Sequence, residues 1–140
     1  MKKCKEVMTN NPVSCLPDDS VAKVAQLMRR DNIGSVLVIE NEQTQMLVGI
    51  VTDRDLRRAT NSPLVLRERW YDEFMLDRIP VRACMSESPT TVTPQTPIAD
   101  AAKIMRDRKI GGLPVMQGDK LVGIVTETDL LNYLIRVLEP

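Results

Sequence analysis

The sequence contains two copies of one pattern, and this duplication restricts the possible fold more than any other feature. Residues 8–39 align without a gap on residues 85–116, and residues 47–56 align on residues 121–130. The second block is the sharper, because LVGIVTDRDL and LVGIVTETDL share eight of ten residues. Two copies of one small unit normally pack about a pseudo-two-fold axis, which offers any site at their seam twice. We therefore expect the functional site in clefts between the two copies.

Composition agrees with one globular unit made of two small lobes. The chain has 140 residues, of which 43% are hydrophobic and 27% are charged. The repeats place a first domain at 1–60, a linker at 61–80 and a second domain at 81–140. A lobe of about 60 residues buries only about 60% of its unfolded surface, so we expect the lobes to stabilise each other.

Charge and hydropathy exclude several partners. The 19 basic and 19 acidic residues cancel, and no run of Lys or Arg could follow a phosphate backbone, so we expect no nucleic acid. No apolar stretch approaches the length of about 18 residues that a membrane span needs. The basic start is followed by polar residues rather than a signal-peptide core, which favours a cytoplasmic protein without a membrane partner.

The counts of cysteine and histidine argue against catalysis and against a metal site. Cys4, Cys15 and Cys84 are odd in number and widely spaced, which favours neither a disulfide framework nor zinc. Histidine, the commonest general base near neutral pH, is absent. The chain also has no Walker-type glycine loop and no nucleophile paired with a base. We expect no enzyme activity, no metal and no catalytic cofactor.

Hydrophobic periodicity, together with residues that begin or end helices and strands, predicts the same order of elements, β-α-β-β-α, in each copy. N-cap candidates at 18–20 open a helix with a regular apolar face, and Asn32 and Gly34 end it. The fold class is α/β (α+β), with two such units packed about a pseudo-two-fold axis. The predicted elements of the first copy are strand 13–16, helix 21–31, strands 35–40 and 46–51, and helix 52–59. Those of the second copy are strand 91–93, helix 97–108, strands 112–116 and 120–125, and helix 127–137.

The linker has a pattern of its own. Leu66, Trp70 and Phe74 recur at a spacing of four, as on one stripe of an amphipathic helix, so we predict a helix at 64–79. This helix either covers its own edge of the core or presents aromatic residues to a partner or to a second copy of the chain.

A hydroxyl and a carboxylate stand three residues apart where a predicted strand meets the last predicted helix of each copy. These are Thr52 with Asp55, and Thr126 with Asp129. One explanation is a capping box, in which Thr and Asp satisfy each other's backbone amides. The other is a nucleotide site, because free amides at a helix N-terminus favour phosphate and a carboxylate can accept from both ribose hydroxyls. Duplication favours the second explanation only moderately, since duplication also preserves core residues.

The combined motifs resemble those of a known family. Met-x-x-x-Pro near a strand start, Ile33-Gly34-Ser35 and Ile110-Gly111-Gly112 before the middle strand, and Gly-Ile-Val-Thr-x-x-Asp are similar to the motifs of the cystathionine β-synthase-type (CBS) domain. The likeness covers both copies and leaves only the linker outside. A tandem pair of this kind is called a Bateman module. The resemblance implies two β-α-β-β-α units that pack through their sheets and leave two clefts.

The resemblance implies a regulatory module that binds an adenosine-containing ligand: AMP, ADP or ATP, or alternatively S-adenosylmethionine or NAD. By position, Asp55 and Asp129 match the ribose-binding aspartate, and Thr52 and Thr126 match the hydroxyl near the phosphate. The remaining positions that match the ligand-binding segments of the family are Ser14, Cys15, Ile33, Gly34, Thr91, Val92, Ile110 and Gly111. The family also implies that each cleft draws on both units, with Asp55 facing Thr91 and Ile110, and Asp129 facing Ser14 and Ile33.

The two predicted sites differ in charge. Arg54 stands between Thr and Asp in the first copy and could bind a phosphate with its fork of donors, whereas the second copy has Thr128. We therefore expect the first site to bind a phosphate-bearing ligand more tightly, unless Arg54 is only a solvated surface charge.

The output of such a module is a further expectation. The resemblance implies a homodimer formed through helices, and an effector protein is possible as a partner. Candidate residues for the dimer contact are Met28, Met105, Leu130, Leu131, Leu134 and Leu138, although Met28 and Met105 fit the core of their own copies better. The alternative function is a structural or dimerisation module whose Thr-x-x-Asp motifs serve only as caps.

Overall fold

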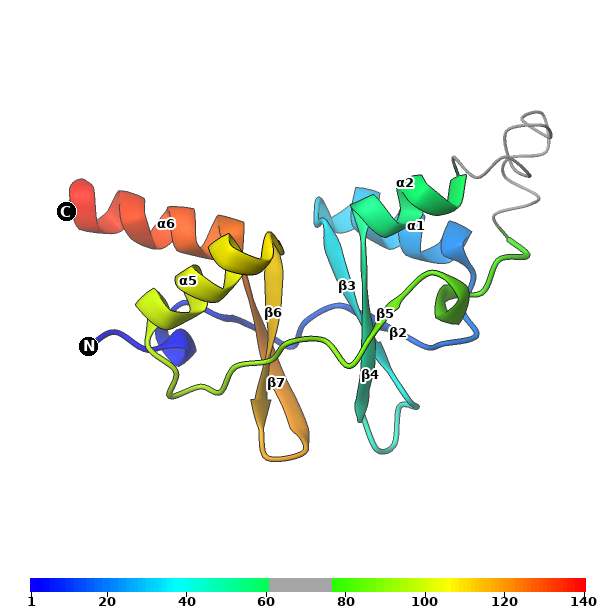
Figure 1. The fold of residues 1–140 in the computed structure, drawn as a ribbon, viewed down its shortest axis with the longest axis horizontal. Coiled ribbons are helices and arrows are strands. Elements are labelled where there is room, and N and C mark those ends of the chain that lie inside the picture. Colours follow the sequence, from blue (N-terminus) through cyan, green and yellow to red (C-terminus); the bar gives the residue numbers. More distant parts are fainter. Residues whose placement is uncertain (61–76) are drawn as a thin grey trace. The chain divides into compact units, whose positions relative to one another are not determined.

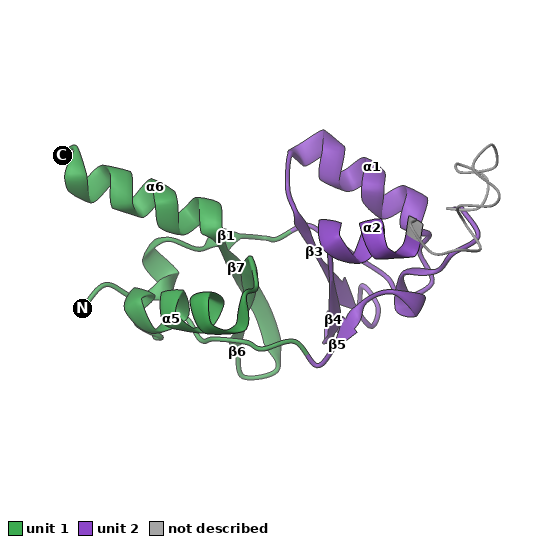
Figure 2. Cartoon of the chain, turned by 45° about the horizontal axis from the view of Figure 1, so that its top comes forward, with its two compact units in different colours: residues 1–12, 89–140 green, residues 13–88 purple. Residues whose placement is uncertain are grey.

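The structure is a computed structural model, and it describes residues 1–60 and 77–140. The chain forms two compact units (Figure 2), of which unit 1 holds residues 1–12 and 89–140 and unit 2 holds residues 13–88. The predicted linker helix at 64–79 falls largely outside the described residues. Each unit mixes helices with a sheet, as the predicted α/β class requires.

Unit 2 contains a four-stranded sheet with two helices packed against it (Figure 1). The strand order is β2-β3-β4-β5, in which β2 runs parallel to β3 and the other pairs are antiparallel. Its elements are β2 (Ser14–Cys15), α1 (Val21–Asp31), β3 (Ser35–Ile39), β4 (Leu47–Thr52), α2 (Asp53–Thr60), the 3-10 turn η3 (Val81–Ala83) and β5 (Ser86–Glu87).

Unit 1 repeats this arrangement with a three-stranded sheet of order β1-β7-β6. Val92 takes the place of the parallel first strand through an isolated bridge to Val115, so the predicted strand at 91–93 is reduced to one bridge. The elements are the 3-10 turn η1 (Cys4–Glu6), β1 (Thr9–Asn10), α5 (Ile98–Arg108), β6 (Gly112–Gln117), β7 (Lys120–Thr126) and α6 (Glu127–Leu138).

The first helix of each copy lies within one residue of its predicted bounds. The Ser20 hydroxyl caps α1 by accepting a hydrogen bond from the Lys23 amide at 3.1 Å. At the other end, Asn32 adopts a left-handed conformation with φ 53°, and its counterpart Lys109 does the same after α5 with φ 54°. A left-handed residue at this position closes the last helical turn.

Each unit completes its sheet with a short segment from the other copy's stretch of sequence. β1 lies at the start of the first repeat but pairs antiparallel with β7 of the second, with Thr9 opposite Ile124. β5 follows the linker but pairs antiparallel with β4, with Ser86 opposite Ile50. The compact units and the sequence repeats are therefore not the same division of the chain.

Each unit has its own hydrophobic core, and the two cores are similar. In unit 2 the fully buried Val24, Val36 and Val51 come from α1, β3 and β4. In unit 1 the fully buried Ala101, Leu113 and Val125 occupy the equivalent elements. Met28 and Met105 lie in these cores, at 8% and 5% exposure, and so belong to the interior rather than to a dimer surface. Among the residues that the structure describes, no helix combines the length and apolar character needed to cross a membrane.

Candidate functional site

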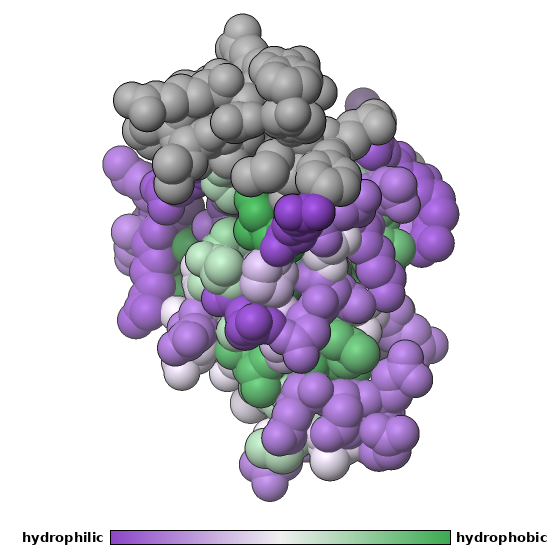
Figure 3. All heavy atoms as spheres, turned by 90° about the vertical axis from the view of Figure 1, so that its right-hand side faces the viewer, coloured by the Kyte–Doolittle hydropathy of each residue, from purple (hydrophilic) through white to green (hydrophobic). Residues whose placement is uncertain are grey.

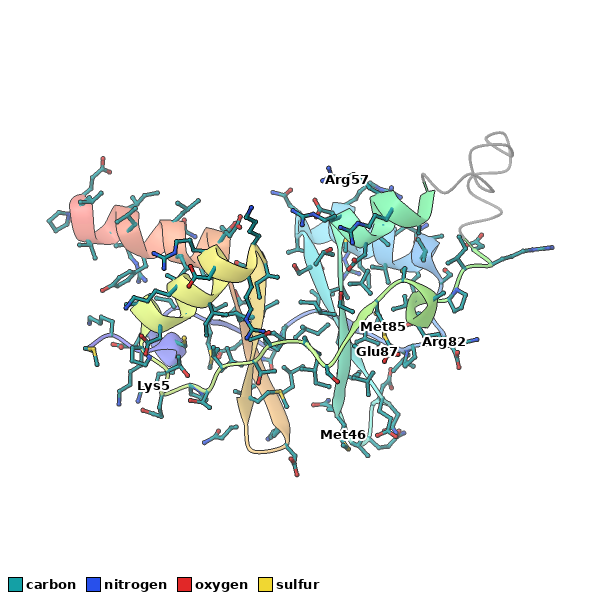
Figure 4. The ribbon with its side chains drawn as sticks, in the orientation of Figure 1. Lys5, Met46, Arg57, Arg82, Met85 and Glu87 are labelled. Atoms are coloured by element: carbon teal, nitrogen blue, oxygen red, sulfur yellow. The ribbon has the colours of Figure 1, made fainter. Side chains whose placement is uncertain are left out.

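The predicted Thr-x-x-Asp motifs lie where β4 runs into α2 in unit 2 and where β7 runs into α6 in unit 1. In unit 2, β4 ends at Thr52 and α2 begins at Asp53, and the Asp53 amide donates to the carbonyl oxygen of Gly34 at 3.0 Å. Figure 4 labels Met46, which precedes the first residue of β4, and Arg57, which lies on α2 after the last residue of that strand. The junction therefore lies at the C-terminal end of β4. Gly34 thus ties the start of β3 to the N-terminus of α2.

Unit 1 repeats the junction closely. β7 ends at Thr126, α6 begins at Glu127, and the Glu127 amide donates to the carbonyl oxygen of Gly111 at 3.1 Å. The duplicated Ile-Gly motif and the duplicated Thr-x-x-Asp motif, which are far apart in the sequence, therefore meet in each unit.

Thr52 and Asp55 form a reciprocal cap. The Asp55 carboxylate oxygen Oδ2 accepts from the Thr52 amide at 2.9 Å and from the Thr52 hydroxyl at 3.0 Å, while the Asp55 amide donates to that hydroxyl at 3.2 Å. Thr126 and Asp129 form the same three bonds at 2.8, 3.0 and 3.3 Å. The capping-box explanation is therefore confirmed, and Oδ2 of each aspartate is fixed by two donors.

These caps change the expected phosphate chemistry. The sequence interpretation expected several free amides at the N-terminus of α2, but Thr52 and Asp55 donate within the cap and Asp53 donates to Gly34. Among the described residues, the Arg54 amide in the first turn of α2 donates no hydrogen bond. Thr128 is the equivalent residue in the first turn of α6. The expectation of several free amides was wrong for this structure, because the local cap satisfies them.

The remaining predicted residues divide between the units. Cys15 and Val92 are 4% and 5% exposed and belong to the two cores, so their side chains face the interior. Unit 2 holds Ser14, Cys15, Ile33, Gly34, Thr52, Arg54 and Asp55. Unit 1 holds Thr91, Val92, Ile110, Gly111, Thr126 and Asp129. The expected cross-pairing of one unit's residues with the other's stays a prediction.

The charges around the two junctions differ. Arg54 is exposed, and Arg57 is paired with Asp53 at 2.9 Å one turn along α2. The equivalent positions of α6 hold Thr128 and Leu131, so unit 1 lacks these two arginines. The junction in unit 2 is therefore the more basic of the two.

The Cys84 thiol lies near the junction in unit 2, within reach of the charge of Asp55. Burial, together with the negative charge of Asp55, raises the pKa of the Cys84 thiol. Burial raises the pKa of Cys15 more strongly, to about 12, with a smaller contribution from Asp19. Both thiols are therefore protonated near neutral pH, which argues against a nucleophilic role.

One contact at the junction of unit 1 was not predicted. The Thr9 hydroxyl donates to the second carboxylate oxygen of Asp129, Oδ1, at 3.2 Å. Sequence reasoning missed it because Thr9 lies outside the predicted strands. One sequence signal pointed to Thr9: the alignment of Met8 with Met85 makes Thr9 and Ser86 equivalent positions in the two copies.

Comparison with known proteins identifies the repeated unit. The family model of the CBS domain matches residues 4–62 and 81–136. A CBS domain-containing protein of Dictyostelium discoideum is 37% identical over 138 residues, which cover 97% of this chain and 93% of that protein. An inosine-5'-monophosphate dehydrogenase of Staphylococcus aureus is 28% identical over 130 residues, but the match spans only 24% of that enzyme and 93% of this chain.

Solved structures share the fold along nearly the whole chain. A Vibrio cholerae protein described as a candidate acetoin utilization protein, AcuB, has a TM-score of 0.82 and 31% identity, covering 99% of this chain and 94% of its own. The structure of CBSX2 in complex with AMP has a TM-score of 0.79 and 25% identity, covering 99% of this chain and 100% of its own.

Proposed function

The chain belongs to the CBS domain family, with two copies of the domain, and from that premise we propose that it is a regulatory module that binds an adenosine-containing ligand. AMP, ADP or ATP is the ligand class we favour, with S-adenosylmethionine or NAD as alternatives. The proposal includes no catalytic activity, since the likeness to the dehydrogenase is limited to 24% of that enzyme.

One observation carries the proposal: each copy holds an aspartate in a fixed orientation by a cap that uses only one of its carboxylate oxygens. In Asp55 both donors of the Thr52 cap bind Oδ2. Within the described part of the chain, Oδ1 of Asp55 accepts no hydrogen bond. A preorganised acceptor of this kind suits a ribose, because little ordering is needed when the hydroxyls bind.

A phosphate group would find its donors next to this aspartate. The Arg54 amide carries the partial positive charge of the α2 N-terminus, and the exposed Arg54 guanidinium adds a full charge. The CBSX2 complex supports AMP as a ligand to test first, because that protein is similar over the whole length of this chain.

The alternative is a structural module whose clefts bind nothing. It has a specific observation in its favour, because the two caps satisfy Thr and Asp without any ligand. The alternatives differ in one measurable respect, which is whether an adenosine compound stabilises the folded protein.

Thermal melting separates the two. A ligand present at a hundred times its dissociation constant adds about 2.7 kcal/mol to the free energy of unfolding. We expect AMP, ADP or ATP to raise Tm of the wild-type protein, and the double variant Asp55→Asn/Asp129→Asn to lose this response. Asparagine keeps an oxygen for each cap, so this control tests the charge of the acceptor rather than the fold. No shift with any of these nucleotides, S-adenosylmethionine or NAD would favour the structural module.

Output through self-association is the second part of the proposal. α6 has no buried residue along its length, and it carries most of the large apolar side chains that are exposed in the described chain. By contrast, the described residues on the face shown in Figure 3 are largely hydrophilic, with smaller apolar patches. The exposed side chains on α6 are Leu131, Leu134, Ile135, Val137 and Leu138, each at least half exposed.

We propose that the exposed apolar face of α6 packs against α6 of a second copy of the chain. Leu131, Leu134, Ile135 and Leu138 follow the spacing of one helical stripe, as in a helix that packs on another helix. An antiparallel pair of α6 helices would place Glu127 at the N-terminus of one near Arg136 at the C-terminal turn of the other. The equivalent stripe on α2 begins with Arg57 rather than leucine, so the fold itself does not require an apolar face here.

A further inference from the structure

The two aspartates at the strand-helix junctions are not equally free to accept hydrogen bonds. Asp129 accepts from the Thr126 amide and hydroxyl at Oδ2, and from the Thr9 hydroxyl at Oδ1. Asp55 accepts from the Thr52 amide and hydroxyl at Oδ2. In the described part of the chain, nothing donates to Oδ1 of Asp55.

The difference does not come from the backbone. Thr9 and Ser86 occupy equivalent positions on two-residue strands, opposite Ile124 and Ile50. Both strands are followed by a residue of positive φ, Asn11 at 50° and Ser88 at 48°. Both positions are exposed and both carry a hydroxyl, yet the Ser86 hydroxyl forms no hydrogen bond with Asp55 or with any other described residue. The contact to Asp129 is therefore specific to Thr9.

The acceptor capacity of the carboxylates turns this contact into a difference in binding. An ionised carboxylate has about four lone-pair positions. Three are used in Asp129 and two in Asp55 by the bonds described above. The 2'- and 3'-hydroxyls of a ribose bring two donors. Asp55 can accept both ribose hydroxyls without losing a bond. Asp129 can accept both only if its hydrogen bond from the Thr9 hydroxyl breaks.

We propose that Thr9 is a specificity-determining residue, whose hydroxyl occupies one acceptor position of Asp129 and so weakens binding of a ribose diol at that site. The proposal rests on the proposed function, because it assumes that the two aspartates bind ribose. It makes Asp55 the site that an adenosine ligand fills first. It also gives this order a cause separate from Arg54, which acts on the phosphate.

The test isolates the Asp129 site with Asp55→Asn and then removes the Thr9 hydroxyl with Thr9→Val. Isothermal titration with AMP should show the double variant binding between about twofold and tenfold more tightly than Asp55→Asn alone, as expected for one released hydrogen bond. The matched pair for the other site, Asp129→Asn with and without Ser86→Val, should show equal affinities.

Titration with 2'-deoxy-AMP distinguishes a ribose effect from a general structural effect. This compound brings one donor fewer, so Thr9→Val should improve its binding much less than the binding of AMP. Equal or weaker AMP binding in the Thr9→Val variant, or equal gains for both compounds, would overturn the proposal for Thr9. If the wild-type protein binds neither AMP nor any other adenosine compound, the proposed function itself fails, which is a different result.

Discussion

Met85 packs so closely over Gly49 that a Cβ atom on Gly49 would stand 2.8 Å from the Met85 sulfur. The same atom would stand 2.9 Å from the carbonyl oxygen of Ser86. Figure 4 labels Met85 and Glu87 on the segment that passes along β4. Gly123 repeats the relationship with Met8 and Thr9, at 2.8 and 2.9 Å. These glycines let the short strands β5 and β1 reach β4 and β7.

Replacing either glycine with alanine should therefore destabilise the protein. We expect Gly49→Ala and Gly123→Ala each to lower the free energy of unfolding by about 1–3 kcal/mol, because the clash includes a backbone oxygen that cannot move aside. Urea denaturation followed by circular dichroism measures the change. Gly34→Ala is the control, since its Cβ would lie 3.9 Å from the nearest atom, an ordinary contact. Equal stability of all three variants would contradict the close approach.

The buried Cys15 thiol should make stability depend on pH in the alkaline range. Burial raises its pKa from 9.0 to about 12 in the folded state. Between these values the unfolded chain loses the proton and the folded chain keeps it, so the unfolded state binds fewer protons. The free energy of unfolding should fall as pH rises from 9 towards 12, by at most about 1.4 kcal/mol per pH unit from this thiol.

The variant Cys15→Val isolates this contribution. Valine has no titrating group, so urea denaturation at pH 8, 9 and 10 should show a shallower decline in stability for the variant than for the wild type. Below pH 9 the two pH dependences should coincide. Parallel declines above pH 9 would show that other groups, such as Cys4 and Cys84, account for the alkaline loss.

The exposed face of α6 should control the oligomeric state. Leu134→Glu places a charge in the middle of the apolar stripe, so we expect the variant to be monomeric at concentrations where the wild type is a dimer. Light scattering coupled to gel filtration measures the mass. Arg58→Glu, at an exposed position of α2, is the matched control and should leave the mass unchanged. A monomeric wild type, or a Leu134→Glu variant that remains dimeric, would rule out the α6 contact.

The sequence predicted the main helices and strands because they follow strong local patterns. Hydrophobic period, N-caps and helix-ending residues such as Asn32 placed α1, α2, α5 and α6 within a few residues of their positions. The two-residue strands β1 and β5 were missed, because such short segments have no hydrophobic period and their pairing partners lie far along the chain. Gly49 and Gly123 were noticed as part of a motif, but their close contacts could be found only in the folded structure.

The sequence located the two strand-helix junctions but predicted their hydrogen bonding only in part. The Thr-x-x-Asp motif correctly located both junctions, and the cap that it forms was one of the two explanations weighed. What sequence could not provide is the number of donors that the cap leaves free, because the Asp53 amide binds Gly34 from another element. The contact between Thr9 and Asp129 is equally non-local, since 120 positions separate the two residues.

Exchanging the residues between Thr and Asp should exchange the phosphate preference of the two sites. Arg54→Thr gives α2 the residue that α6 has, and Thr128→Arg does the reverse. Because Arg54 is exposed, its attraction for a phosphate is screened by solvent and should be worth up to about 1 kcal/mol, or a factor of about five in affinity. We expect Arg54→Thr to weaken AMP binding at the Asp55 site, and Thr128→Arg to strengthen it at the Asp129 site, by up to that factor.

Each exchange is measured calorimetrically in a background that leaves one site, Asp129→Asn for the first and Asp55→Asn for the second. Adenosine, which lacks the phosphate, is the matched ligand, and its affinity should be the same with arginine or threonine at either position. The two backgrounds alone also test the order of the sites, since the protein that retains Asp55 should bind AMP more tightly. Equal AMP affinities in these backgrounds would contradict that order, and an arginine effect of the same size for adenosine would show that Arg54 acts on something other than the phosphate.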